Sequence, residues 1–311
     1  MINALINAAR NGKNVEVMLE LRARFDEEAN LEWKEKLEEE GVKVFVGMPH
    51  LKVHAKICAI RKRVGKKIIQ YGFVSTGNLN ESTAKVYSDH CLLTSDRGIM
   101  TDIARIFRYF ENPKDNEALL RSCRTLILSP VKMRKEMEML IHKEIRHAKA
   151  GKPASIILKL NSLSDEQLIA KLYEAAAAGV KVQLIIRSIF CSVSDAKKIK
   201  GDIQAISIVD EYLEHSRILL FEHGGKQKIF ISSADWMVRN IDHRIEVTAP
   251  VKDKNIRKEL VQFLKIQLSD NVKARVLDHA LQNRYVTSST KKKIRSQLEI
   301  YNFLEQQRNS E

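Results

Sequence analysis

The stretch that decides the fold occurs twice in this chain: residues 14–25 are NVEVMLELRARF, and residues 179–190 are GVKVQLIIRSIF. Each copy is a short apolar run that predicts a strand, and each strand runs into an arginine. A helical pattern precedes each copy, over residues 2–10 and over residues 165–178. Strands that alternate with helices indicate α/β layers, so the repeat predicts two α/β units related by duplication.

Working outward from the repeat, the same order of elements is expected in both halves of the 311-residue chain. We expect further helices over 26–40, 97–110, 131–149 and from 252 onward, and strands over 15–21, 42–46, 51–61, 67–74, 126–128, 156–160, 180–186, 204–209, 217–221, 227–232 and 244–248. Glu111-Asn-Pro113 should end a helix. The polar stretch over 112–124 then predicts a boundary, with a first unit of residues 1–118 and a second unit of residues 119–311.

A histidine followed two residues later by a cation also occurs in both units. His54-Ala-Lys56 lies 30 residues after Arg24, and His215-Ser-Arg217 lies 28 residues after Arg187. In a strand, residues i and i+2 point to one face. Each pair is therefore expected to present an imidazole and a positive charge together.

A small-residue turn and a carboxylate follow each histidine. Ser75-Thr-Gly-Asn78 precedes Asp89 by 11 residues, and Ser232-Ser-Ala-Asp235 precedes Glu246 by 11 residues. Small residues let a phosphate approach the backbone closely. A lone strand histidine is more often packed or exposed than catalytic, and a duplicated domain can keep its pattern for folding alone. Folding, however, has no evident need for a histidine and a cation on one strand face.

Two histidines that meet across a pseudo-twofold axis suit phosphoryl transfer through a covalent intermediate. One imidazole attacks phosphorus while the other protonates or orients the leaving group. The attacking ring must be neutral, and a carboxylate on its other nitrogen fixes the tautomer. Asp89 and Glu246 are the candidates for that role. The cations Lys56, Arg217, Arg187 and Arg24 would neutralise phosphate oxygens.

The composition agrees with an anionic partner. Lysine and arginine total 53 against 39 acids, a formal charge of +14, which favours nucleic acid, an anionic membrane face, nucleotides or an inorganic polyanion. The four cysteines are scattered without a CxxC pair, so a zinc site or disulfide framework is not expected and the thiols should be reduced. The sequence contains neither a membrane-span-length apolar run nor a recognisable signal peptide.

The histidine–cation pairs and the turns that follow them resemble the phospholipase D superfamily. That family usually carries an aspartate five residues after the lysine, where this chain has Arg61. The resemblance implies two duplicated phospholipase-D-like α/β domains with mixed sheets flanked by helices. The departure weakens the lipase or nuclease interpretation.

The closer resemblance is to polyphosphate kinase of the bacterial, histidine-phosphorylated type, of which this chain is similar to the two C-terminal catalytic domains. The segments that carry it are 23–30 (ARFDEEAN), 51–56 (LKVHAK), 75–81 (STGNLNE), 83–89 (TAKVYSD), 158–161 (LKLN), 205–210 (AISIVD), 212–215 (YLEH), 232–237 (SSADWM) and 239–246 (RNIDHRIE).

The resemblance implies a role for each matching residue. His54 would carry the phosphoryl group and His215 would be the second catalytic histidine, near the nucleotide phosphates. Tyr87 and Arg187 match ATP-binding residues, and Arg24 matches an arginine at the magnesium–phosphate site. We add Asn78, Arg217 and Asp235 as ATP-binding candidates and Lys56, Asp89 and Glu246 as catalytic ones.

The implied activity is reversible transfer of the ATP terminal phosphate to polyphosphate through a phosphohistidine, with ATP or ADP as substrate. Mg²⁺ should bridge the phosphates rather than lie in a protein carboxylate cage. The resemblance also implies a dimer or tetramer, no specific nucleic acid, and a cytoplasmic protein, or one peripheral at the inner membrane. Family residues upstream of Met1 are expected to be missing, so this chain alone should be weak or inactive.

Two alternatives stay open at this point. One is a phospholipase-D-type phosphodiesterase or phosphatidyl transferase that uses the same histidines. The other is a non-enzymatic module that binds nucleic acid or another polyanion, in which the paired histidines and carboxylates would have no task.

Overall fold

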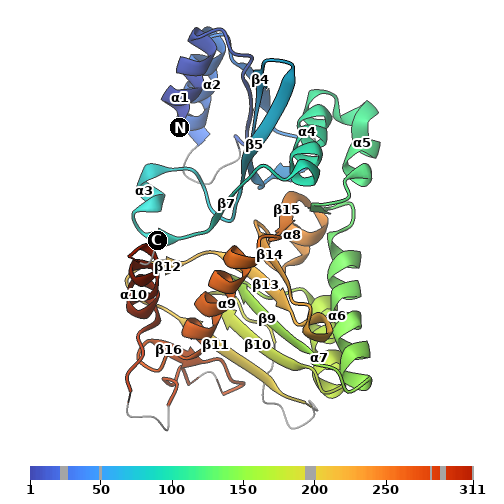
Figure 1. Cartoon of the computed structure of the whole chain (residues 1–311), viewed down its shortest axis with the longest axis vertical. Coiled ribbons are helices and arrows are strands. Elements are labelled where there is room, and N and C mark those ends of the chain that lie inside the picture. The colour runs from blue at the N-terminus through green and yellow to red at the C-terminus, as the bar shows by residue number, and fades with distance from the viewer. Residues whose placement is uncertain (22–26, 49–50, 193–200, 281, 288–291, 310–311) are drawn as a thin grey trace.

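The computed structural model describes residues 1–21, 27–48, 51–192, 201–280, 282–287 and 292–309 (Figure 1). The first unit contains α1 (Ile2–Arg10), β1 (Glu16–Leu19), α2 (Glu27–Glu39), β2 (Lys43–Val46), β3 (Lys52–Val53), β4 (Lys56–Val64), β5 (Lys67–Ser75), α3 (Glu81–Ala84), β6 (Tyr87–Ser88), β7 (Cys91–Thr94), α4 (Arg97–Glu111) and α5 (Pro113–Ser122). Strands alternate with helices, as the sequence predicts.

The second unit follows the same alternation. It contains β8 (Ile127–Ser129), α6 (Met133–Lys149), β9 (Ser155–Leu160), α7 (Glu166–Ala177), β10 (Lys181–Ile186), β11 (Ile203–Ile208), β12 (Leu213–Glu214), β13 (Arg217–Phe221), the 3₁₀ turn η1 (His223–Gly225), β14 (Lys228–Ser232), α8 (Val238–Asp242), β15 (Arg244–Pro250), α9 (Lys254–Leu268), β16 (Ala274–Val276) and α10 (Ser296–Arg308). Together the two units form a mixed α/β fold with helices flanking the main sheet, which confirms the predicted class.

The second unit is built on one large mixed sheet. Its strand order is β16-β11-β10-β9-β13-β14-β15-β3, with β8 also paired to β15. β9, β10 and β11 are parallel, whereas β13 is antiparallel to both β9 and β14, and β14 is antiparallel to β15. β13 reads RILLF and is buried at every position, as expected of a strand covered on both faces.

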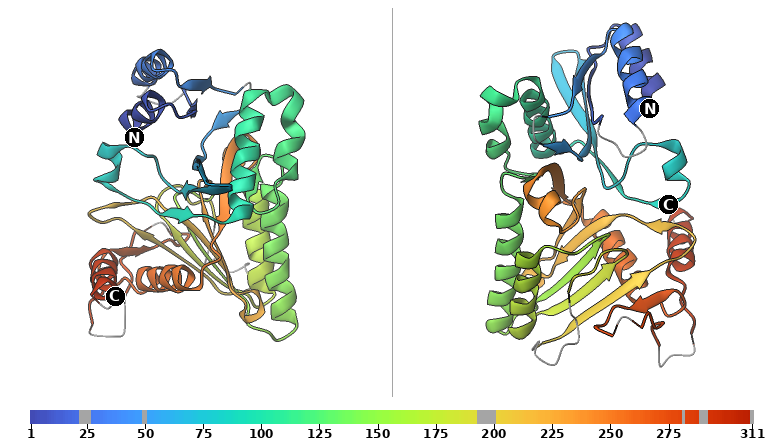
Figure 2. Two further views of the ribbon diagram at one scale, coloured as in Figure 1. Left: turned by 45° about the horizontal axis from the view of Figure 1, so that its top comes forward. Right: turned by 180° about the vertical axis from the view of Figure 1, so that it is seen from behind.

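Helices cover both faces of that sheet (Figures 1 and 2). α6 and α7 pack on one face, where Met137 and Leu168 join Ile156 and Leu158 in one apolar cluster. α9 covers the other face, where its Phe263 and the Ile218 of β13 belong to a second cluster that extends to α4. The sheet therefore lies at the centre of a three-layer arrangement.

The first unit is more open. β1 and β2 form a separate parallel pair under α1 and α2, and β4-β5-β7 form an antiparallel sheet. In the second unit, β9 pairs with both β10 and β13 and so joins the parallel and antiparallel strands into one sheet. Among the described residues of the first unit, no strand joins the β1-β2 pair to the β4-β5-β7 sheet. β4 and β5 therefore project as a long hairpin, with Ile60 46% exposed and Ile69 45% exposed.

Two short parallel pairings join the units. β3 pairs with β15, where Val53 is opposite Ile245, and β12 pairs with β6, where Glu214 is opposite Ser88. In each pairing, the strand that precedes a histidine lies beside a strand of the other unit. The junction between the units is therefore where the two histidine motifs lie.

The structure differs from the expectations in several elements. The polar stretch over 112–124 contains the helix α5, with Pro113 in its first turn, and the tail expected to be helical from 252 onward contains the strand β16. The boundary at residue 118 falls within α5 and stays a prediction. The strand predicted over 51–61 is wrong as a single strand, because it is interrupted at His54 and Ala55. No helix in the described part of the chain is long and apolar enough to span a bilayer.

Candidate active site

The backbone around His54 is fixed by the second unit. The N–H groups of His54 and Ala55 both donate to the carbonyl of Ile245, each at 3.0 Å. Two donors on one carbonyl end the pairing of β3 with β15, which explains why the strand is interrupted before β4 begins. The residue after Ile245 is Glu246, whose Oε1 lies 2.9 Å from His54 Nδ1.

The backbone around His215 repeats this geometry with the units reversed. The N–H groups of His215 and Ser216 both donate to the carbonyl of Ser88, at 3.1 and 2.9 Å. The next residue, Asp89, places its Oδ2 2.8 Å from His215 Nδ1. Each histidine is therefore paired with the carboxylate of the other unit, an exchange that the sequence order does not reveal.

A hydroxyl of its own unit holds each carboxylate in place. Thr76 Oγ1 donates to Asp89 Oδ1 at 2.6 Å, and Ser233 Oγ donates to Glu246 Oε2 at 2.5 Å. Both hydroxyls occupy the second position of the repeated small-residue turn, a signal in the sequence that we did not use. Glu246 also accepts from Asn240 Nδ2 at 2.6 Å, a contact without a sequence signal.

The protonation of the His54 pair follows from its burial. The Glu246 side chain is 0% exposed and that of His54 is 25% exposed. Burial alone would raise the pKa of Glu246, but His54, Lys56 and Ser233 together hold that pKa below its ordinary value. Burial lowers the pKa of His54, and this effect exceeds the opposing pull of Glu246. The carboxylate therefore accepts a hydrogen bond from the Nδ1–H group, and Nε2 keeps its electron pair.

The His215 pair titrates in the same way. Burial lowers the pKa of His215 despite the hydrogen bond from its ring to Asp89. Burial would raise the pKa of Asp89, but His215 and Thr76 hold that pKa below its ordinary value. Both site carboxylates are thus charged and both imidazoles neutral near pH 7.

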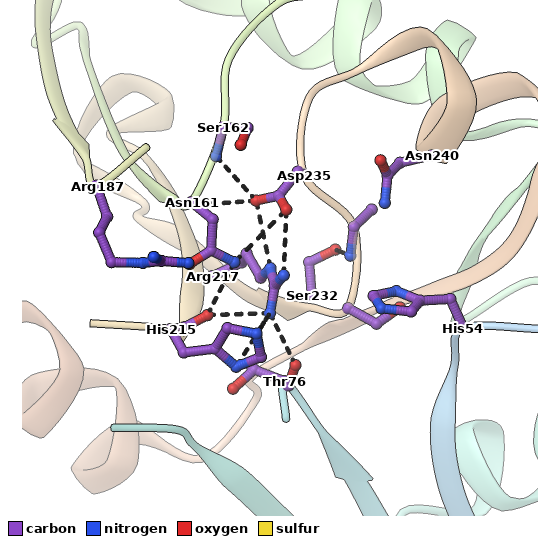
Figure 3. A network of polar contacts seen from close by, with 12 residues as sticks. His54, Thr76, Asn161, Ser162, Arg187, His215, Arg217, Ser232, Asp235 and Asn240 are labelled. Carbon is purple, nitrogen blue, oxygen red and sulfur yellow. Dashed lines mark hydrogen bonds and ion pairs between the residues drawn. The ribbon is translucent and has the colours of Figure 1, made fainter. Parts of the chain in front are cut away.

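Arg217 crosses between the units beside His215 (Figure 3). Its Nη1 donates to the backbone carbonyls of Thr76 and His215, each at 3.0 Å, and lies 3.3 Å from His215 Nε2. Asp235 pairs with the guanidinium at 3.1 Å and fixes it from behind. The positive charge is therefore held rigidly at the face of the second imidazole.

Lys56 provides the corresponding cation of the first unit. Its Nζ turns back to the carbonyl of His54, so the ammonium stays near that ring even though the two residues do not share a continuous strand. Burial lowers the pKa of Lys56 to about 7, and Glu246 opposes this shift. The interpretation that each histidine has its cation beside it is thus supported, by a different backbone geometry from the one predicted.

The two histidines share one electrostatic environment. The charges of Lys56 and Arg217 act on the pKa of both His54 and His215. Figure 3 shows both imidazoles at the same junction, with the Arg217 guanidinium against the ring of His215. One anionic group that reaches this junction would meet two imidazoles and two cations.

A pocket of about 280 Å³ opens next to His215. Tyr87 lines it and also contacts His215, with ring centroids 5.0 Å apart. Arg187, at the end of β10, lines it too and is oriented by Asn161 Oδ1 and by the carbonyl of Glu214 at 2.9 Å. The structure therefore brings Tyr87, Arg187 and His215 close together at one edge of the junction.

The remaining candidates differ in position. Asn78 is exposed at the end of its turn. Asp235 is buried and accepts from the backbone N–H groups of Asn161 and Ser162 as well as from Arg217, so its oxygens are already engaged. Arg24 lies outside the described residues. Arg61 is exposed on the β4 hairpin, where the phospholipase D pattern would have an aspartate.

The site offers no ready cage for a metal ion. The described residues contain no group of three histidine, cysteine, aspartate or glutamate side chains that could hold one. The two carboxylates nearest the histidines are occupied by the imidazoles. The side chains of the described site therefore do not by themselves fit a magnesium ion.

Comparison with known proteins assigns the chain to a family. Residues 1–116 match the family model "Polyphosphate kinase C-terminal domain 1", and residues 126–297 match "Polyphosphate kinase C-terminal domain 2". The chain is 44% identical to the polyphosphate kinase of Vibrio cholerae and 43% identical to that of Escherichia coli K12, over 98% of its length in both.

A solved structure agrees with these sequence matches. The crystal structure of polyphosphate kinase from Porphyromonas gingivalis matches all of this chain at 40% identity with a TM-score of 0.90, and the match covers 47% of that protein. The chain likewise spans 43% of the Vibrio cholerae protein and 44% of the Escherichia coli protein. This chain belongs to the polyphosphate kinase family and corresponds to its two C-terminal domains.

Proposed function

We propose that this chain is the catalytic part of an enzyme that transfers the terminal phosphoryl group of ATP reversibly to polyphosphate through His54. One observation carries the proposal: His54 and His215 each bind the carboxylate of the opposite unit through Nδ1, so that each Nε2 lies on the side of the ring away from its carboxylate, at a junction with two cations, of which Arg217 lies 3.3 Å from His215 Nε2. Family membership supports the substrates, ATP and polyphosphate.

In the first step, the electron pair of His54 Nε2 attacks the terminal phosphorus of ATP. A P–N bond forms while the P–O bond to the β-phosphate breaks, and ADP leaves with that electron pair. Positive charge develops on the His54 ring because Nδ1 keeps its proton. Glu246, fully buried and charged, stabilises this imidazolium.

The second histidine and the cations act on the oxygens. To orient the leaving phosphate or protonate it, His215 would first take up a proton from solvent at Nε2, and Asp89 would stabilise the resulting imidazolium. Arg217 and Lys56 would offset the negative charge of the transferring group. Asp235 then contributes to nucleotide binding through Arg217, which it holds in place.

In the second step, a terminal oxygen of polyphosphate attacks the phosphorus carried by His54. A P–O bond forms, the P–N bond breaks, and the electron pair returns to Nε2. The chain lengthens by one phosphate, and the reverse sequence makes ATP from ADP. Two in-line transfers at one nitrogen require the two substrates to occupy the junction in turn.

Substrate binding is assigned to the residues around the junction. Tyr87 and Arg187 would hold the nucleotide in the pocket beside His215, with Asn78 contacting the phosphates from the turn. Magnesium would reach the site on the phosphates themselves and balance their charge there. The role of Arg24 at that site rests on the family resemblance alone. We keep a homo-oligomer, and a cytoplasmic or inner-membrane-peripheral location, as parts of the proposal.

Labelling with γ-labelled ATP tests the proposal on the 311-residue chain and on a longer protein that carries it. We expect acid-labile, base-stable label on the longer protein, and weak or no label on the chain alone. His54→Ala should abolish the label, whereas His142→Ala, at an exposed position on α6, should leave it unchanged. Label that survives His54→Ala would refute the assignment.

The phosphodiesterase alternative is tested by the same proteins without ATP. Hydrolysis of bis-p-nitrophenyl phosphate, dependent on both histidines, would favour that alternative. Binding of polyanions without label or hydrolysis would favour a module that only binds. The exposed Arg61, at the position of the expected aspartate, is the observation that favours the kinase.

A further inference from the structure

A single buried ammonium group holds the residues on both sides of His215. Lys159 Nζ lies 3.0 Å from Glu214 Oε2 and donates to the carbonyl of Ser216 at 3.3 Å. The side chains of Lys159 and Glu214 are 2% and 3% exposed. The lysine thus fixes the chain immediately before and immediately after the catalytic ring.

The carboxylate of Glu214 is fully partnered from three directions. Besides Lys159, it accepts from Gln267 Nε2 at 2.7 Å and from Gln297 Nε2 at 2.8 Å. Burial would raise the pKa of Glu214, but Lys159 and the two amides together hold that pKa below its ordinary value. The carboxylate is therefore charged, and the pair cannot move without losing several hydrogen bonds.

The helix α10 adds further hydrogen bonds to the segment that contains β12. The side-chain amide of Gln297 accepts from Tyr212 N at 3.0 Å and donates to Tyr212 O at 2.7 Å, as a neighbouring strand would. The backbone carbonyl of Glu214 in turn receives Arg187 Nε at 2.9 Å. The segment that carries His215 is thus tied to the end of the chain and to the nucleotide pocket.

Stability alone does not account for such a pair. Burying two opposite charges costs about as much as their attraction returns, and apolar residues of similar volume are often as stable or more so. Every partner in this network acts on residues 212–216 rather than on the core at large.

Among the described residues, the chain before His54 is held by a contact of another kind. The residue before it is Val53, whose N–H donates to Glu20 Oε2 at 2.8 Å in the strand pairing with β15. The difference between the two histidines suggests that His215 needs an additional restraint because it must meet a substrate held by a pocket next to it.

We infer that Lys159 and Glu214 are positioning residues for His215, and that Gln297 passes this restraint to α10. The inference rests on the proposed function for its activity test. Replacing both charges by apolar groups, in Lys159→Met/Glu214→Leu, should lower the melting temperature only modestly, because the burial cost of two charges is removed while the amide of Gln267 loses its acceptor. The same variant should lower kcat about 10- to 100-fold with little change in KM for ATP, because the ring is no longer held in register.

The measurement uses the longer protein that carries this chain, with ATP and polyphosphate. Asp102→Asn serves as the matched control, because Asp102 is a buried carboxylate that accepts the N–H groups of Arg124, Thr125 and Leu126 away from the histidines. The control should lower the melting temperature and leave kcat unchanged. If the double variant loses stability and activity together, Gln297→Ala, at a partly exposed position, should still lower kcat about threefold at unchanged stability.

A second readout separates this inference from the proposed function. The His215 Nδ1 proton, hydrogen-bonded to Asp89, should give a downfield NMR signal in the 311-residue chain, and the double variant should shift or broaden it. If the unmodified protein shows no turnover but the double variant still changes the NMR signal, only the proposed function is refuted. A folded double variant with unchanged kcat and an unchanged signal would overturn the inference.

Discussion

The two units share one order of elements but are packed in opposite ways. In the second unit, β13 and β14 lie inside a large sheet and are buried, whereas β4 and β5 of the first unit project as a hairpin with exposed Ile60 and Tyr71. Despite this, the contacts of His54 and His215 repeat one another almost atom for atom. The geometry of the site therefore depends on the exchange at the junction, and the surrounding sheet can change without altering it.

The exchanged carboxylates provide the sharpest test of this symmetry. Glu246→Gln should lower kcat about 10⁴-fold, because loss of the charge removes the stabilisation of the His54 imidazolium and favours the wrong tautomer. Asp89→Asn should cost less, about 10²-fold, because its side chain is 20% exposed and that of Glu246 is 0% exposed. Steady-state kinetics on both variants measures the difference. Equal losses would mean that the two pairs act identically.

The packing difference should appear directly in stability. Phe221 and Ile60 lie at the same position, four residues after the cation of each unit, and their exposures are 0% and 46%. Phe221→Ala should lower the free energy of unfolding by about 3–5 kcal/mol, since it leaves a cavity in the core. Ile60→Ala should change it by less than about 0.5 kcal/mol. Denaturant titration tests both, and a large loss at Ile60 would mean that the hairpin is covered in solution.

The hydroxyls that hold the carboxylates should have a smaller and more equal effect. Thr76→Val and Ser233→Ala each remove one hydrogen bond to a site carboxylate, at 2.6 and 2.5 Å. We expect about a tenfold loss of kcat in each, with KM for ATP little changed. Thr101→Val, which removes an exposed helix contact on α4, is the control. Unequal losses at Thr76 and Ser233 would mean that the two hydroxyl–carboxylate hydrogen bonds do not have equivalent roles.

The cations should differ in their response to pH. Because the pKa of Lys56 is lowered to about 7, its charge is present below that pH and is lost as the pH rises through it. The affinity for polyphosphate should therefore fall a few-fold between about pH 6 and about pH 8, where an ordinary lysine stays charged. Lys56→Arg should remove this change. If the change persists in Lys56→Arg, another group is responsible, such as a phosphate of the ligand.

Much of the scaffold is predictable from local patterns. The run RILLF of β13 and the cation-rich sequence of β4 already distinguish a buried strand from an exposed one. The repeated spacing also identifies His54, His215, Asp89 and Glu246. These signals are periodic or repeated, which is why they can be read without coordinates.

The exchange at the junction could not be predicted in the same way. β3 and β6 contain two residues each, too few for any periodicity, and the donors and acceptors that place the histidines are backbone groups of Ile245 and Ser88. Both units carry the same order of residues, so either carboxylate could serve either ring. The assumption of a continuous strand at His54 failed because two amides share one carbonyl.

The crossed pairing has a consequence for how this molecule can be divided or assembled. A unit produced by itself would contain an imidazole without its acid and an acid without its imidazole, so it would hold two half-sites and no whole one. Covalent linkage turns the encounter of the halves into an intramolecular event, with an effective concentration far above that of separate chains. A separation of the units by a few ångströms would break both histidine–carboxylate hydrogen bonds at once. The contact between the units is therefore the place where activity can be switched off.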